Sequence, residues 1–144
     1  MNHIASFFII ATSIFLTSCG GSGKTSVAQD YFETCLNEES EGRLKLNDFN
    51  KTNGYDSKGI SGQEGCVIEF EAVIEPTQTV RKANCGNLRQ KWCWDHLRVI
   101  DMNVRSRNLK LVKGEEISLI GKVYLRDTEN GWRGEGYKIG EGKK

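Results

Sequence analysis

The chain opens on a continuous apolar run and continues as short periodic segments separated by polar stretches. Residues 1–18 contain no Asp, Glu, Lys or Arg, and residues 4–16 read IASFFIIATSIFL. A helix needs about 20 apolar residues to cross the hydrocarbon core, whereas a run of roughly 10 to 14 is typical of a signal-peptide core or a buried helix. The pattern predicts a cleaved secretory signal over residues 1–18. An uncleaved signal anchor and a buried N-terminal helix are the alternatives.

The next periodic segment, residues 26–39, has the spacing of a helix that packs on a core. Its apolar stripe consists of Val27, Tyr31, Phe32 and Cys35 (or Leu36). Ser26 is a residue type that caps helix N-termini, because its side-chain oxygen accepts a backbone N–H bond. We expect a helix from about Ser26 to Glu39.

Alternation with a period of two predicts strands in the rest of the chain. The clearest is CVIEFEAVIE, residues 66–75, in which apolar and acidic side chains take opposite faces. Its expected inner face is Ile68, Phe70, Ala72 and Ile74, and its outer face is Glu69, Glu71 and Glu75. Residues 117–125 and 132–139 alternate on either side of a turn at Thr128–Gly131, which predicts a hairpin.

The remaining strand predictions rest on shorter patterns. Residues 43–49 form a strand that ends at the Asn53-Gly54 turn, and a loop covers Asp56–Gly65. Residues 97–104 and 109–112 are weaker strand candidates. One helix followed by four or five antiparallel strands predicts an α+β fold, with the helix across one face of the sheet. Residues 27–140 form this single domain, and 141–144 form a tail.

The apolar run closes on Leu16-Thr17-Ser18-Cys19, which resembles the lipobox of bacterial lipoproteins. The resemblance implies that the Cys19 thiol receives a diacylglyceryl group, that the signal is cut before Cys19, and that the new amino terminus is acylated, for example with palmitate. Two or more acyl chains hold a protein stably at a membrane. Gly20, rather than Asp, follows Cys19, which in that family is compatible with sorting to an outer membrane. The implied location is the cell envelope, with the domain in the periplasm.

Residues 20–26, GGSGKTS, are expected to extend from the lipid as a flexible tether, so that residues 19–26 separate the signal from the domain. They do not match a phosphate-binding loop. That motif needs a glycine five positions before Gly23, where this chain has Ser18, and a preceding strand, where this chain has the signal.

Four cysteines remain once Cys19 is assigned to lipid: Cys35, Cys66, Cys85 and Cys93. An exported chain meets oxidising conditions, so an even number favours two disulfides, with three possible connectivities. We expect Cys35–Cys66 and Cys85–Cys93, each contributing roughly 2–4 kcal/mol. Buried free thiols are the alternative. Zinc binding by Cys85, Cys93 and His96 is not expected, since their spacing matches no usual ligand set.

Charge is balanced overall, with 20 basic and 19 acidic residues, which argues against nucleic acid as a partner. The balance is uneven along the chain: residues 27–80 carry eleven acids and four bases, and residues 81–113 carry nine bases and two acids. The basic segment can form a surface for an anionic envelope partner, or the two segments can neutralise each other across the sheet. The members of this surface are Arg81, Lys82, Arg89, Lys91, Arg98, Arg105, Arg107 and Lys110.

Aromatic side chains at Trp92 and Trp94 flank Cys93 within that basic segment. They suit either a binding surface or the cover of a small core. Asp95 and His96 do not form a dyad as strand neighbours, because such side chains point to opposite faces. The candidate binding residues are Trp92, Trp94, His96, Arg89, Lys91 and Arg98. No catalytic motif, metal site or cofactor site is predicted.

The segments LKLNDFNKTNG, CVIEFEAVIE and VKGEEISLIGKVYLRDTENGWRGEGYKI together resemble small bacterial lipoproteins with cystatin-like or NTF2-like envelope domains. The resemblance supplies no catalytic residues. We therefore expect a lipid-anchored, non-enzymatic module that presents a sheet face or the Arg81–His96 loop to an envelope protein, a glycan or another anionic partner. A small-ligand carrier with a sheet-lined pocket and an enzyme that uses His96 with a carboxylate are the alternatives. The oligomeric state stays open.

Overall fold

The computed structural model describes residue 19 and residues 21–58, 62–81 and 110–140. One helix, α1 (Ser22–Glu39), crosses an antiparallel sheet in the order β1-β2-β5-β6. These strands are β1 (Leu44–Lys58), β2 (Glu64–Pro76), β5 (Ile117–Thr128) and β6 (Gly131–Ile139). Two short strands, β3 (Val80–Arg81) and β4 (Lys110–Leu111), pair separately. The predicted α+β class is confirmed, with four strands in the sheet.

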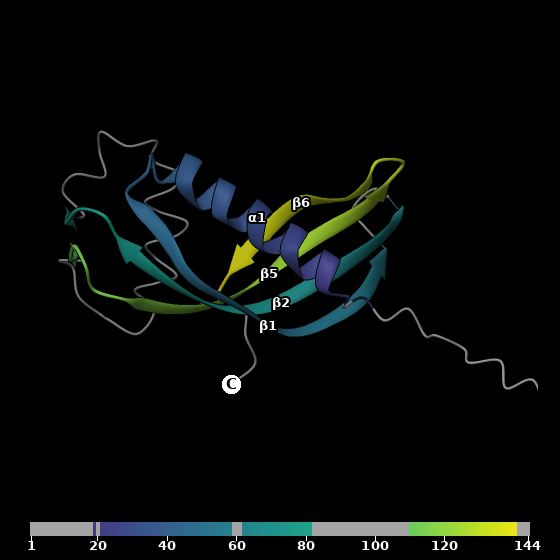
Figure 1. The fold of residues 1–144 in the computed structure, drawn as a ribbon, viewed down its shortest axis with the longest axis horizontal. Helices are drawn as coiled ribbons and strands as arrows, with labels where there is room; N and C mark the ends of the chain where they lie inside the picture. The colour runs from purple at the N-terminus through teal and green to yellow at the C-terminus, as the bar shows by residue number, and fades with distance from the viewer. Residues whose placement is uncertain (1–18, 20, 59–61, 82–109, 141–144) are drawn as a thin grey trace, which may run out of the picture.

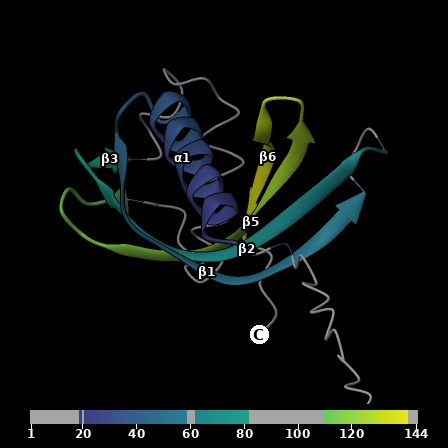
Figure 2. The same ribbon diagram turned by 45° about the vertical axis from the view of Figure 1, so that its right-hand side comes forward.

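The sheet curves around α1, which lies along its concave side (Figures 1 and 2). Strands β1 and β6 are the edges of this sheet, and β2 and β5 are its centre. We call the face that is turned away from α1 the outer face. The fold is therefore a helix layer on a sheet layer, with the core between them.

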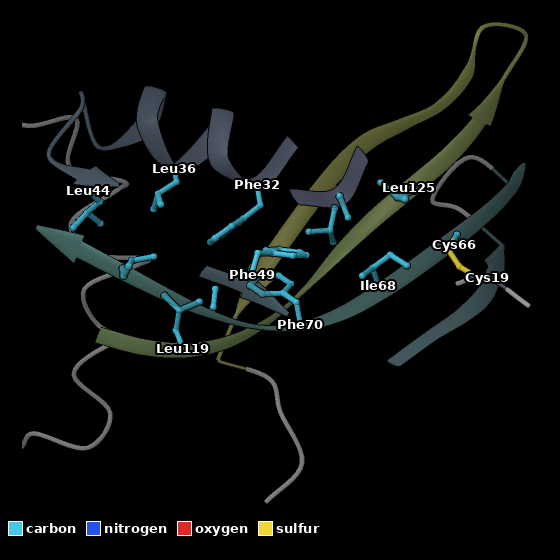
Figure 3. Close-up of a cluster of buried hydrophobic side chains, with 14 of the residues drawn as sticks. Cys19, Phe32, Leu36, Leu44, Phe49, Cys66, Ile68, Phe70, Leu119 and Leu125 are labelled. Atoms are coloured by element: carbon cyan, nitrogen blue, oxygen red, sulfur yellow. A yellow bond between two sulfur atoms is a disulfide. The ribbon is translucent and has the colours of Figure 1, made fainter. Parts of the chain in front are cut away.

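The core between the two layers centres on aromatic rings. Phe32 of α1 is fully buried, and its ring centroid lies 4.8 Å from Phe70, 5.4 Å from Tyr137 and 6.2 Å from Phe49. Figure 3 shows the Phe32, Phe49 and Phe70 rings among aliphatic side chains of the helix and the sheet. As the alternation predicts, Ile68, Phe70, Ala72 and Ile74 of β2 reach this core, and Cys66 on the same face joins them.

Helix α1 begins earlier than the sequence predicts. It starts at Ser22, with Gly21 at the N-cap, so that Ser22–Ser26 form its first turns rather than a flexible tether. Lys24 lies over the ring of Trp132, 4.3 Å from its centroid, and this contact holds the first turn against β6. The helix ends where predicted, at Glu39. Buried Ser40 then accepts a hydrogen bond from the Leu44 backbone N–H at 3.1 Å, which joins α1 to β1.

Strand β1 is much longer than the sequence predicts. It runs through Asn53 and Gly54 to Lys58, so the predicted turn at Asn53-Gly54 is wrong and the loop before β2 is short. Pairing with β2 over its whole length outweighs the local turn preference. Two register shifts, one of them between Lys51 and Asn53, absorb the irregular residues.

The C-terminal hairpin is as predicted: β5 pairs with β6, and the turn closes at Gly131, whose φ is +96°. Strand β4 falls within the predicted segment 109–112 but pairs outside the main sheet. Residues 97–104 lie outside the described residues.

Candidate functional site

The first candidate feature is a disulfide between Cys19 and Cys66 at one end of the core (Figure 3). Their Cα atoms are 5.8 Å apart, which is a normal separation for a disulfide. Cys19 is 1% exposed and Cys66 is 0% exposed. Gly54 of β1 fits directly against Cys19, since a Cβ at that position would overlap the Cys19 carbonyl oxygen. The N-terminal cysteine is thus packed into the domain.

This bond overturns the predicted Cys35–Cys66 pair. Cys35 is a free, half-buried cysteine on α1. It faces Tyr31 and Glu39 of its own helix, whereas Cys66 lies on the inner face of β2 next to Cys19. Cys85 and Cys93 lie outside the described residues, so their predicted pair stays a prediction.

The second feature is a polar cluster between α1 and β6, made of Tyr31, Cys35, Glu39 and Tyr137. The Tyr137 hydroxyl donates a hydrogen bond to Glu39 Oε2 at 2.5 Å. Tyr31 is one turn before Cys35, and its ring covers Gly134, where any Cβ would overlap it. The absence of a side chain at Gly134 is therefore what allows the helix to approach β6 this closely.

The surroundings in this cluster raise the pKa values of the two tyrosines and of the cysteine. Burial, reinforced by Cys35, raises the pKa of Tyr31 to about 12. Burial and the hydrogen bond to Glu39 raise the pKa of Tyr137. Burial also raises the pKa of the Cys35 thiol; the hydrogen bond with Tyr31 opposes this rise and the charge of Glu39 adds to it. A nucleophilic cysteine needs a lowered pKa, so this cluster joins helix to sheet rather than activating a thiol.

The third feature is the outer face of the sheet, where polar side chains form two ordered groups. In the first, Glu69 accepts from Lys122 at 3.2 Å and from Asn53 at 3.2 Å, while Lys122 also reaches the Tyr55 hydroxyl at 3.5 Å. These acceptors raise the pKa of Lys122. The predicted acidic face of β2 is thus confirmed, and Glu69 on it is paired.

The second group lies further along the same face. Glu75 accepts from Asn47 at 2.8 Å and pairs with Lys45 at 3.2 Å, and both contacts lower the pKa of Glu75. Asn47 also donates to Glu116 at 3.3 Å. Surface pairs of this kind contribute little to stability. Their effect is to order the side chains on this face.

Exposed hydrophobic side chains lie on the outer face among these polar groups. Tyr55 is 39% exposed and Ile120 is 37% exposed. The strand register places Tyr55 opposite Val67 and Ile120 opposite Glu71, and Val67 and Glu71 point the same way along β2. Tyr55 and Ile120 therefore share the face that α1 leaves open.

Sequence reasoning missed both of these residues as surface candidates. Tyr55 follows the Asn53-Gly54 pair and reads as part of a loop. The alternation of residues 117–125 could have identified Ile120 as a surface residue, because it falls between the core positions Leu119 and Gly121.

A groove of about 530 Å³ lies on the other side of the molecule, between α1 and the start of β1. Its lining is mostly polar and includes Asp30, Glu33, Thr34, Asn37, Glu38, Lys45 and Thr77. The concave side of the sheet is instead filled by the aromatic core. This groove is a polar surface feature and differs from the sheet-lined apolar pocket that a carrier of apolar ligands needs.

The predicted binding residues Trp92, Trp94, His96, Arg89, Lys91 and Arg98 lie outside the described residues. In the described part, no three His, Cys, Asp or Glu side chains lie together so as to hold a metal ion. No helix there has the length and apolarity that a membrane span requires. No protein-family model, curated protein or solved structure matches this chain.

Proposed function

We propose that this protein is a lipid-anchored protein of the bacterial cell envelope whose domain binds another protein. The observation that carries the anchor is the lipobox-like end of the apolar run, Leu16–Cys19. Its cysteine stands only three residues before the first residue of α1. Lipid on Cys19 would hold the domain directly at the membrane surface, with Gly20 favouring the outer membrane where the cell has one.

The anchor is tested by mass spectrometry and acyl labelling of the full chain expressed in a bacterium. The wild-type protein is expected to lose residues 1–18 and to gain acyl groups on Cys19. Cys19→Ala is expected to keep the signal and take up no label. Cys66→Ala is the matched control, because it removes the same disulfide and leaves the lipobox intact. A wild-type mass without acyl groups, or equal membrane retention and labelling of Cys19→Ala, would refute the anchor.

The binding surface that we propose is the outer face. Tyr55 and Ile120 supply apolar contact area there, and tyrosine is enriched among residues that dominate interface energies. Ordered polar groups surround them, which lowers the entropy lost when a partner binds. Charges of both signs lie on this face, so a partner with mixed charges around an apolar contact fits it best. The strand register places the cationic groups Lys45, Lys122, Arg126 and Lys138 there. The carboxylates are Asp48, Glu69, Glu71, Glu75 and Glu116.

Site-specific photo-crosslinking tests this surface in the intact envelope. A photoreactive residue at Ser118, exposed beside Ile120, is expected to give a discrete protein adduct. The same residue at Glu33, exposed on α1, is the control and is expected to give none. Tyr55→Ala together with Ile120→Ser should weaken the Ser118 adduct. Equal adducts from Ser118 and Glu33, or no effect of the double substitution, would contradict the proposal.

A further inference from the structure

The Cys19 sulfur can form one of two bonds, a thioether to lipid or a disulfide to Cys66. A thioether to lipid uses the same valence as the disulfide to Cys66, so a molecule that carries one cannot carry the other. Resting on the proposed lipid anchor, we infer that Cys66 regulates lipidation: the Cys19–Cys66 disulfide blocks lipid transfer, and oxidation before transfer leaves the chain without its anchor.

The packing around the disulfide explains why the block is complete. Cys19 and Cys66 are both almost fully buried, and Gly54 approaches the Cys19 backbone so closely that it can carry no side chain. A phospholipid donor cannot bring its glycerol carbon to a sulfur in this position. The disulfide state is therefore closed to lipid transfer both chemically, since no thiolate is present, and sterically.

The topology determines at which stage of folding the disulfide can form. The disulfide joins residues 47 positions apart, and the intervening chain contains all of α1 and β1. Cys66 reaches Cys19 only when β2 has paired with β1 and the first turns of α1 lie on the sheet. Lipid transfer to the newly exported chain thus competes with folding of the first three elements. Fast transfer gives the anchored form, and early folding with oxidation gives the disulfide form.

The two branches, lipid transfer and disulfide formation, both consume the Cys19 thiol. In lipid transfer, the Cys19 thiol loses its proton, its sulfur bonds a glycerol carbon of the donor, and the carbon–oxygen bond to the phosphate headgroup breaks. In disulfide formation, the Cys19 and Cys66 thiols lose two protons and two electrons to a thiol oxidant. Reduction of the disulfide by a dithiol returns Cys19 to the first branch.

The lipidated form has a different N-terminal arrangement. A sulfur that carries two acyl chains does not fit the buried position beside Cys66 and Gly54, so Cys19 must leave it. This frees the residues before Ser22 to act as a short tether and leaves Cys66 without its partner. Lipidation and the packed N-terminus are thus alternative states of the same chain.

Pulse-chase acyl labelling of the full chain in a bacterium, with and without the thiol oxidant diamide, tests this inference. Oxidant added at the start of the chase should lower the lipidated fraction of the wild type several-fold. Cys66→Ala should keep its lipidated fraction, because Cys19 then lacks its partner. Cys35→Ala is the matched control and should respond like the wild type. Non-reducing peptide mapping of the unlipidated wild type should yield a Cys19–Cys66 linked peptide.

Any other result contradicts the inference. An equal loss of lipid from wild type and Cys66→Ala would assign the effect to something other than this disulfide. An unlipidated wild type without the linked peptide, or no loss at all, would overturn it as well. Absence of acyl label from every variant, even without oxidant, would instead refute the lipid anchor itself.

Discussion

The Cys19–Cys66 disulfide gives the sharpest quantitative prediction for the unlipidated chain. Consider residues 19–144 with a free Cys19, oxidised so that the bond forms. Cys66→Ala and Cys19→Ala each remove this bond, and Cys35→Ala leaves it intact because Cys35 is a free thiol. The three variants therefore separate the bond from the general effect of removing a cysteine.

The size of the effect follows from the sequence separation. Closing a loop of 47 residues restricts the unfolded chain, and the loop-entropy relation gives about 4 kcal/mol at 25 °C. Both single variants should lower the free energy of unfolding by nearly this amount. Cys19→Ala and Cys66→Ala remove the same bond. The double variant should therefore be at most about 0.5 kcal/mol less stable than the less stable of the two single variants.

Urea unfolding followed by circular dichroism measures these free energies. Cys35→Ala should stay within about 1 kcal/mol of the wild type. Losses below about 1 kcal/mol for both Cys19→Ala and Cys66→Ala, or fully additive losses in the double variant, would show that the bond does not hold the fold as reasoned.

Three further predictions concern the contact between α1 and the sheet. Phe32→Ala removes the fully buried ring at the centre of the core and should lower the free energy of unfolding by about 3–5 kcal/mol in urea titrations, with Glu33→Ala nearly neutral as the exposed control. Gly134→Ala puts a methyl group into the Tyr31 ring and should cost about 1–3 kcal/mol, whereas Gly136→Ala, with open space around it, should cost less; equal costs would contradict the close approach. The free energy of unfolding should also fall at alkaline pH. The pKa of Tyr31 is about 12 in the folded protein, above its ordinary value of 10. The stabilisation by protonated Tyr31 is therefore complete below pH 10 and is lost as the pH rises toward 12. Tyr31→Phe should make the unfolding midpoint less sensitive to pH in this window, and a pH profile equal to that of the wild type would show that folding does not raise the pKa of Tyr31.

Most of the fold could be predicted from local patterns. Alternation in residues 66–75 correctly assigned Ile68 and Phe70 to the core and Glu69 to the opposite face. The turn ending at Gly131 and the helix end at Glu39 were also predictable, because turn chemistry and helical periodicity act within a few residues. Failures occurred where long-range pairing opposed a local signal. Asn53-Gly54 favours a turn, yet β2 continues past it and keeps both residues in β1.

The candidate surfaces were less predictable than the fold. Tyr55 and Ile120 are 65 positions apart in sequence, and only the register of β1 on β2 and of β2 on β5 places them on one face. The polar cluster of Tyr31, Cys35, Glu39 and Tyr137 likewise depends on the absence of a side chain at Gly134, which lets α1 lie close to β6.

The sequence by itself determined the fold class, the faces of the central strand and the lipobox-like cysteine, because each depends on spacing between near neighbours. Only the tertiary structure decided what meets that cysteine. The number of cysteines in the sequence does not show which two thiols lie close enough to bond, because their distance depends on how α1, β1 and β2 pack. Cys19 is bonded to Cys66, so the residue that we propose to carry lipid is also the residue that joins the start of the domain to β2, and we propose that its oxidation state selects between these two roles.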